Sequence, residues 1–218
     1  MKKNKVTEVV FIIDASGSMK ALRDDALGSI NTVLEEKQKT SYEGKIFITM
    51  VMFNNSVSLL RDKVSIRDVP PLTEKEYVPN GLTALYDAIG KTIECLEKRR
   101  HRERTGERYD KTLCFIMTDG MENASRRFDR ATVKEMLEDR QGNGWEFVFL
   151  ASNIDAEESA RHIGISKERA IGWHADGMGL RGIGRGMSRC MESVIMEDHS
   201  FVREDFSEAD EDFKRRKK

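Results

Sequence analysis

The sequence is poor in cysteine and has almost no net charge. Its 218 residues include three cysteines, and 37 Lys and Arg against 38 Asp and Glu give a net charge of -1. Cys95, Cys114 and Cys190 lie far apart among apolar neighbours, without a CxxC motif or a Cys/His cluster. We expect them to be small core residues in a reducing compartment, not disulfides or zinc ligands. The balanced charge excludes a global field that would attract nucleic acid or an anionic membrane, so such a partner would need a local patch.

Long hydrophobic runs are missing as well. No stretch approaches the roughly 20 apolar residues that cross a bilayer. The apolar run after the basic start MKKNK is cut short by Asp14, which makes it too short for a signal peptide. We therefore expect a cytoplasmic protein without a membrane partner.

Hydrophobic segments alternate with segments of helical spacing along most of the chain. The hydrophobic segments are near-continuous, which is typical of strands covered on both faces. They span 5–14, 45–54, 111–119 and 145–152, with a short one at 169–173. Between them, apolar residues recur every three or four positions, as in helices. This order predicts an α/β fold: a doubly wound, mostly parallel central sheet with helices on both faces.

Two segments depart from this order. Only Asn54 and Asn55 separate the segment 56–64 from the preceding strand, so we expect a tight hairpin and one antiparallel edge strand. The last residues, SEADEDFKRRKK, are charged and nearly free of apolar side chains. We expect a single domain over 1–200 and a charged, mobile tail over 201–218.

A glycine-rich helix is expected near the end of the domain. Apolar residues recur at helical spacing over 176–197, where Gly182 and Gly186 would let the helix pack closely on a neighbour. Three arginines fall four apart along another face of this helix and form either a solvated stripe or a contact for an acidic partner. They are Arg181, Arg185 and Arg189.

Polar side chains follow two of the predicted strands where these strands end. Asp14 ends the first strand and is followed by Ser16 and Ser18, and Asp119 ends a later one. In open α/β sheets, ligands bind outside the carboxyl ends of the strands, so we expect these side chains to meet. Thr83 stands just ahead of a predicted helix in NGLTALYDAIG and can present its hydroxyl at the same edge.

All of these candidate donors are oxygen atoms. A cluster of hydroxyls and carboxylates without His or Cys favours a hard divalent cation such as Mg²⁺, Mn²⁺ or Ca²⁺ over zinc. With two carboxylates and no dense acidic loop, Mg²⁺ is the most natural occupant, because it keeps several of its waters. A cation bound mainly by neutral hydroxyls keeps much of its charge and can recruit an outside carboxylate.

Three separated motifs together resemble the metal-ion-dependent adhesion site, or MIDAS, of von Willebrand factor type A (vWA) domains. They are DASGS after an apolar strand, the lone threonine of GLTALYDAI, and TDG at the end of a later strand. The resemblance implies that Ser16, Ser18 and Thr83 are direct metal ligands. It implies that Asp14 and Asp119 hold coordinating waters or move into direct contact with the metal.

The resemblance, which covers approximately residues 6–175 in element order, implies a binding module and not an enzyme. A protein partner supplies an Asp or Glu that completes the metal shell. In build, this short single-domain chain resembles the intracellular bacterial type of vWA protein. Such proteins are often associated with ATPase-containing or stress-response assemblies, so an assembly of this kind is the partner expected by analogy.

Two other classes of function are weighed against this reading. A Mg²⁺-dependent phosphoryl-transfer or hydrolytic enzyme would use Asp14 as its nucleophile, but such enzymes usually place a second aspartate where this chain has Ser16. A nucleic-acid binder would use the basic segment 98–108, KRRHRERTGER, which has no interleaved aromatic residues for base stacking. A helix C-terminus favours such cations, so we expect no nucleic-acid partner. The loop after TDG is the expected place of residues that shape partner choice: Glu122, Asn123, Arg126 and Arg127.

Overall fold

Six strands form one sheet in the order β3-β2-β1-β4-β5-β6. The structure is a computed structural model that describes residues 5–103, 109–196 and 203–216. All neighbouring strands are parallel except β2 and β3, which are antiparallel. The strands are β1 (Val6–Asp14), β2 (Lys45–Phe53), β3 (Val57–Ser65), β4 (Lys111–Thr118), β5 (Trp145–Ala151) and β6 (Ala170–Gly172).

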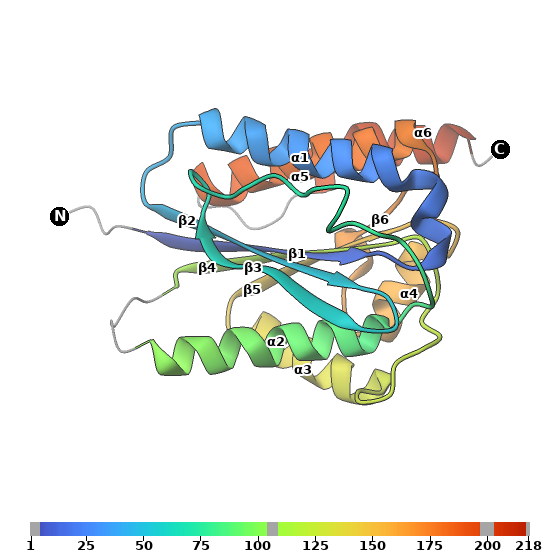
Figure 1. The fold of residues 1–218 in the computed structure, drawn as a ribbon, viewed down its shortest axis with the longest axis horizontal. Helices are drawn as coiled ribbons and strands as arrows, with labels where there is room; N and C mark the ends of the chain where they lie inside the picture. Colours follow the sequence, from blue (N-terminus) through green and yellow to red (C-terminus); the bar gives the residue numbers. More distant parts are fainter. Residues whose placement is uncertain (1–4, 104–108, 197–202, 217–218) are drawn as a thin grey trace.

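Helices cover both faces of the sheet, so the predicted doubly wound α/β fold is confirmed. In Figure 1, α1, α5 and α6 lie above the sheet, and α2 and α3 lie below it. The α-helices are α1 (Arg23–Lys39), α2 (Leu85–Arg102), α3 (Arg130–Gly142), α4 (Ala156–His162), α5 (Gly177–Met196) and α6 (Ser207–Arg216). Three short 3-10 helices complete the described elements: η1 (Gly17–Leu22), η2 (Lys167–Arg169) and η3 (Arg203–Phe206).

The central strand β1 supplies a hydrophobic core on each face of the sheet. Its odd-numbered residues, such as Phe11 and Ile13, belong to the core under α1 and α5. Its even-numbered residues Val10 and Ile12 belong to the core under α2 and α3. Successive side chains of a strand point to opposite faces, so an apolar residue at nearly every position of β1 is what two covered faces require.

The hairpin between β2 and β3 places β3 at the edge of the sheet, as predicted, but its turn is longer than two residues. The strands end at Phe53 and begin again at Val57. The N–H of Asn54 donates to the carbonyl of Ser56 over 2.9 Å, and the side chain of Asn54 accepts the N–H of Ser56 over 2.9 Å. An asparagine side chain that bonds to the backbone two residues on stabilises such a turn.

Part of the basic segment 98–108 neutralises a buried carboxylate. Glu8 on β1 is fully buried, and its Oε2 accepts hydrogen bonds from Arg99 over 2.6 Å and from Arg100 over 2.8 Å. A buried carboxylate is costly unless it is paired. These two arginines are thus explained by the fold, whereas residues 104–108 lie outside the described part of the chain, and the absence of a nucleic-acid partner stays a prediction.

The end of the chain is helical and packed against α5, so the mobile tail predicted over 201–218 is wrong for η3 and α6. Phe206 is fully buried and Ala209 is 4% exposed. A Cβ added to Gly186 would lie 2.2 Å from Cδ1 of Phe206, and one added to Gly182 would lie 3.5 Å from Ala209. The two glycines therefore permit the close packing that the sequence predicted. The first two and last two residues of the predicted tail lie outside the described residues.

The arginine stripe of α5 is engaged within the chain. Arg185 and Arg189 pair with Glu208 of α6 at 2.7 and 2.8 Å. Arg181 lies 3.4 Å from Asp25 of α1. These exposed ion pairs each contribute little stability. They show that the three arginines pair with acidic side chains of the same chain and do not form a solvated stripe.

The cysteines are free thiols. Cys114 and Cys190 are buried, and burial raises the pKa of both thiols above the usual value near 9. A buried thiol with a raised pKa is unreactive, which agrees with the core role predicted for these two residues. Cys95 on α2 is only partly buried.

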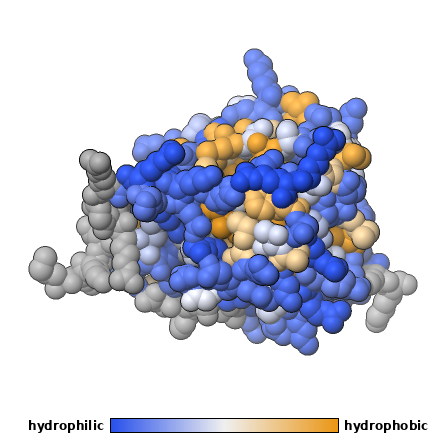
Figure 2. Space-filling view, turned by 90° about the horizontal axis from the view of Figure 1, so that it is seen from below, coloured by the Kyte–Doolittle hydropathy of each residue, from blue (hydrophilic) through white to orange (hydrophobic). Residues whose placement is uncertain are grey.

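Among the residues described, no helix is both long and apolar enough to cross a membrane. Figure 2 shows the side of the molecule on which α2 and α3 lie: hydrophilic residues cover most of it, and hydrophobic residues show between them.

Candidate metal centre

The carboxyl ends of the parallel strands lie on the right of Figure 1. The five candidate residues are at this edge of the sheet or in the loops that adjoin it. Asp14 is the last residue of β1, and Asp119 directly follows β4, its parallel neighbour. Ser16 directly precedes η1, Ser18 lies in its first turn, and Thr83 precedes α2 by two residues. The parallel pairing of β1 and β4 is what brings the two aspartates, far apart in sequence, to one edge.

Hydrogen bonds fix both carboxylate oxygens of Asp14. Oδ1 accepts the backbone N–H of Ser16 over 2.7 Å, and Oδ2 accepts the hydroxyl of Thr118 over 2.6 Å. The hydroxyl of Tyr77 donates to the carbonyl of Asp14 over 2.8 Å. These bonds hold the side chain in one orientation, because Asp14 and Thr118 are both fully buried.

A chain of hydrogen bonds joins Ser16, Ser18 and Asp119. The two serine hydroxyls lie 3.0 Å apart, and the hydroxyl of Ser18 donates to Oδ1 of Asp119 over 2.6 Å. Ser16 is buried, whereas Ser18 is exposed. The cluster thus reaches from the core to the surface, where a ligand has access to it.

Gly120 marks the point where Thr83 joins this cluster. A Cβ added to Gly120 would lie 3.7 Å from Oγ1 of Thr83 and 3.9 Å from Oγ of Ser18. Asn123 holds the backbone of Thr83 by two hydrogen bonds. The N–H of Thr83 donates to Oδ1 of Asn123 over 2.8 Å, and the N–H of Asn123 donates to the carbonyl of Thr83 over 3.0 Å. All five predicted residues therefore converge on one edge of the sheet.

Tight backbone contacts bind the two loops that carry the hydroxyls. The N–H of Gly17 donates to the carbonyl of Gly81 over 2.9 Å. Gly81 has a φ of +73°, and a Cβ there would lie 1.9 Å from Oδ1 of Asn55. Glycine is favoured at this position, because other residues rarely adopt this φ and a Cβ would displace the side chain of Asn55.

The electrostatics of the cluster suit a cation. Burial raises the pKa of Asp14 and of Asp119 above the usual value near 3.8, and the hydroxyl and amide hydrogen bonds act in the opposite direction. Among the described groups that act on these two pKa values, none is cationic. Two buried carboxylates at one site repel each other unless a proton or a cation lies between them. The donor set fits a divalent metal.

The type of donor fits a hard metal. Nowhere in the described residues are three or more His, Cys, Asp or Glu side chains grouped as a metal site. The candidate site instead combines two carboxylates with three hydroxyls, and oxygen donors of this kind suit Mg²⁺, Mn²⁺ or Ca²⁺.

Two residues that support the site were not identified from the sequence, Thr118 and Tyr77. Thr118 stands in the TDG motif, so its position was a signal, but its bond to Asp14 depends on the packing of β1 beside β4. Tyr77 carries no local signal, because its partner Asp14 lies 63 positions away.

Residues of the loop after TDG form hydrogen bonds that hold the backbone near the candidate site. The carboxylate of Glu122 accepts the N–H of Tyr86 over 2.9 Å and that of Ser125 over 2.7 Å. Arg127 pairs with Glu94 at 2.6 Å. Glu122, like Asn123, therefore holds the start of α2 beside this loop, a role that the sequence did not predict.

By sequence, the chain matches no protein-family model and no curated protein. By structure, it matches the vWF domain of the type V pili tip protein Mfa5 from Porphyromonas gingivalis. That match covers 88% of this chain and 97% of the other, with a TM-score of 0.62 and 11% sequence identity. This chain has the fold of a von Willebrand factor type A domain. The identity is too low to show more than the fold.

Two other solved vWA-like structures carry metals in their names. One is proximal thread matrix protein 1 from the mussel byssus with a zinc-occupied MIDAS motif, with a TM-score of 0.57 and 18% identity over 85% of this chain. The other is manganese-loaded TRAP protein of Plasmodium vivax, with a TM-score of 0.56 and 16% identity over 83% of this chain and 72% of TRAP. This chain spans less than half the length of several solved proteins that it resembles, 45% in the mussel case.

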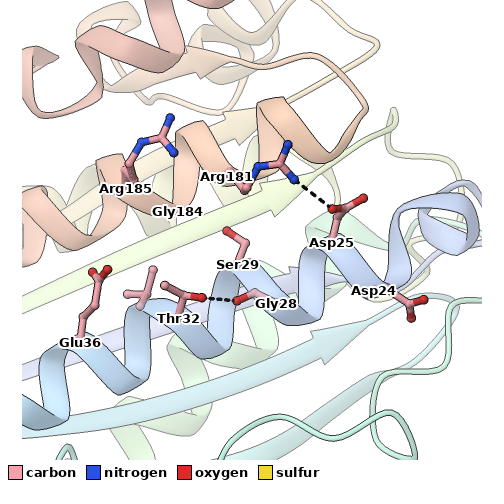
Figure 3. A pocket seen from close by; sticks show the side chains of 10 residues that line it. Asp24, Asp25, Gly28, Ser29, Thr32, Glu36, Arg181, Gly184 and Arg185 are labelled. Carbon is pink, nitrogen blue, oxygen red and sulfur yellow. Dashed lines mark hydrogen bonds and ion pairs between the residues drawn. The ribbon is translucent and has the colours of Figure 1, made fainter.

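A separate groove lies between α1 and α5 of this vWA fold (Figure 3). Its volume is about 430 Å³, and none of the five candidate residues lines it. Gly28 and Gly184 contribute to its wall, and Asp25 and Arg181 form an ion pair at one end. The groove is therefore distinct from the metal edge, by which we mean the carboxyl-terminal edge of the sheet with Asp14, Ser16, Ser18, Thr83 and Asp119.

Proposed function

We propose that this chain is a metal-dependent protein-interaction module. A divalent cation, Mg²⁺ in the first place, is held by Asp14, Ser16, Ser18, Thr83 and Asp119. A protein partner then supplies an Asp or Glu side chain to the cation. The expected setting stays the cytoplasm, and the expected partner stays an ATPase-containing or stress-response assembly.

One observation carries this proposal. Asp14 and Asp119 are buried, and their side-chain hydrogen bonds among the described residues come from hydroxyls and an amide, not from a cationic side chain. Burial of an ionised carboxylate without a positive partner is unfavourable. A bound divalent cation removes this penalty, and the vWA fold places the cluster at the sheet edge where ligands of α/β proteins bind.

Each residue has a defined part in the proposed site. The exposed hydroxyl of Ser18 and the buried hydroxyls of Ser16 and Thr83 would be direct ligands, as in the family that the motifs resemble. Asp14 and Asp119 would hold coordinating waters. Because neutral hydroxyls leave the cation much of its charge, the site would retain an attraction for one further carboxylate.

The proposal includes that the chain is not an enzyme. Each oxygen of Asp14 accepts a hydrogen bond, from Ser16 and from Thr118, and these bonds weaken the carboxylate as a nucleophile. Incubation with acetyl phosphate and Mg²⁺, followed by mass spectrometry of the intact protein, tests this part. A phosphorylated Asp14 would favour the phosphoryl-transfer alternative.

The metal site is tested by calorimetric titration of metal-stripped protein with Mg²⁺, Mn²⁺ and Ca²⁺. We expect saturable binding that is lost in an Asp14→Ala, Ser16→Ala double variant whose circular dichroism shows it to be folded. The matched control is Asp24→Ala, Ser41→Ala, which changes the same residue types at exposed positions. Equal binding in both double variants, or none in the wild type, would overturn the assignment.

A further inference from the structure

Exposed hydrophobic side chains gather on the loops of the metal edge. Six large hydrophobic residues are exposed in the described chain, and three of them, Val78, Leu82 and Met121, belong to the loops that carry Thr83 and Asp119. Their exposed fractions are 52%, 52% and 70%. Single exposed apolar residues need no explanation, but several around one site mark an interaction surface.

Leu82 and Met121 stand next to the candidate metal donors in the sequence. Leu82 directly precedes Thr83, and Met121 directly follows Gly120, whose added Cβ would lie 3.7 Å from the hydroxyl of Thr83. The loop with Thr83 and the loop with Gly120 approach each other at these two residues. Leu82 and Met121 are each one residue away from that approach in the sequence.

The backbone under these side chains is held in place. The N–H of Leu82 donates to the side chain of Asn55 over 2.8 Å. The residue after Met121 is Glu122, whose carboxylate accepts the N–H of Tyr86 over 2.9 Å. A backbone that is already held in place loses little conformational entropy on binding, which suits these two positions to recognition.

No acidic side chain of this edge is fully exposed. Within 14–22, 77–84 and 119–123, the two aspartates are buried, Glu122 is partly buried and bonded to backbone N–H groups, and Lys20 is the one exposed charged side chain. The rest of the exposed surface is apolar, amide or small. It complements a segment with one carboxylate among apolar side chains better than it complements a run of acidic residues, which would bring several charges against a single lysine.

We propose that the partner segment consists of an Asp or Glu flanked by large apolar side chains, which pack on Leu82 and Met121 while the carboxylate reaches the metal. This inference rests on the proposed function. It adds the chemistry of the neighbours of the acidic residue, which the metal alone does not select.

The test uses a displayed peptide library with a fixed central Glu and random flanks. The library is bound to the immobilised full chain in Mg²⁺ and eluted with EDTA. We expect large apolar residues to be enriched beside the Glu. By calorimetry, a synthetic consensus peptide should bind at least about tenfold more tightly than the same peptide with Ser at the flanks.

Leu82→Ser, Met121→Ser is the test variant, and Leu59→Ser, Met178→Ser is the matched control at exposed apolar residues outside these loops. The test variant should lose the tenfold preference, which corresponds to about 1.4 kcal/mol, and keep the Mg²⁺ affinity of the wild type. The control should keep both.

The two proposals fail in different ways. If Mg²⁺ does not bind the wild type, the proposed function and this inference fall together. If Mg²⁺ binds but no peptide elutes with EDTA, the capture of a carboxylate by the cation falls together with this inference. If peptides elute with EDTA but their flanks show no apolar enrichment, or the test variant keeps the preference, this inference alone is overturned.

Discussion

At the scale of single residues, the metal edge depends on hydroxyls that are not themselves expected to bind metal. Thr118 is the clearest case, because its buried hydroxyl donates to Oδ2 of Asp14 over 2.6 Å. The five candidate ligands could be named from the sequence because their motifs are local. The support by Thr118, Tyr77 and Asn123 was not, because it arises only when strands and loops distant in sequence are packed together.

Thr118→Val should weaken Mg²⁺ binding by roughly tenfold and destabilise the fold by about 1–3 kcal/mol, since it removes a donor from a buried carboxylate and keeps the shape of the side chain. Calorimetric titration and denaturant unfolding measure the two effects. Thr92→Val is the control, because Thr92 is also buried and its hydroxyl donates to the carbonyl of Ala88 within α2. Unchanged Mg²⁺ affinity in Thr118→Val would contradict the supporting role.

Glu76 makes stability depend on pH. Hydrogen bonds from Arg61 are the main reason that the pKa of Glu76 falls from its usual 4.5 to about 2. Because the pKa is lower in the folded state, the charged carboxylate stabilises the fold above about pH 4.5, and this contribution is lost as the pH falls towards 2.

We therefore expect Glu76→Gln to be less stable than the wild type at pH 7 and equally stable near pH 2. Urea unfolding of both proteins across this pH range checks the prediction, with Glu74→Gln as the control because its side chain is 78% exposed. A stability difference that does not change between pH 7 and pH 2 would contradict it.

At the scale of elements, the strands were predictable and the end of the chain was not. Strands buried on both faces are recognised by continuous apolar runs, and β1 is one from end to end except for Thr7 and Glu8 and its terminal Asp14. The last helix has one apolar residue for every few charges. The end of the chain packs through Phe206 of η3 and through Ala209 and Phe213 of α6. Their spacing of three and four is a helical signal that the surrounding charges concealed.

The contact of α5 with the end of the chain leaves no room for a Cβ at Gly186. Gly186→Ala should destabilise the protein by about 1–3 kcal/mol, because a Cβ would lie 2.2 Å from Cδ1 of Phe206. In a domain of this size, that corresponds to a fall in Tm of roughly 2–4 °C per kcal/mol.

Gly28→Ala is the matched control. Gly28 lies inside α1, where an added Cβ would meet nothing within 4 Å, so this change should stabilise the helix by about 0.5–1 kcal/mol. Opposite shifts of Tm in the two variants are the expected result. A neutral or stabilising Gly186→Ala would show that η3 does not pack on α5 in solution.

At the scale of the whole molecule, the sheet concentrates its polar chemistry at one edge. The loops after β1 and β4 and the loop before α2 meet there, so a bound cation would link three segments that otherwise touch through a few hydrogen bonds. The order of strands and helices and the MIDAS motifs were enough to predict this edge. The apolar residues around it were not identified, since an exposed Leu or Met looks the same in sequence as a buried one.

If a cation binds the folded edge and not the unfolded chain, as proposed, Mg²⁺ should raise the stability of the whole domain. At 100 times its Kd the gain is about 2.7 kcal/mol, or roughly 5–10 °C in Tm for a domain of this size. Thermal unfolding in Mg²⁺ and in EDTA measures it. The Asp14→Ala, Ser16→Ala variant should show no such difference, whereas Asp24→Ala, Ser41→Ala should behave as the wild type. An equal shift in the two double variants would mean that Mg²⁺ stabilises the chain elsewhere. The assignment of the metal site to the carboxyl-terminal edge of the sheet would then be wrong.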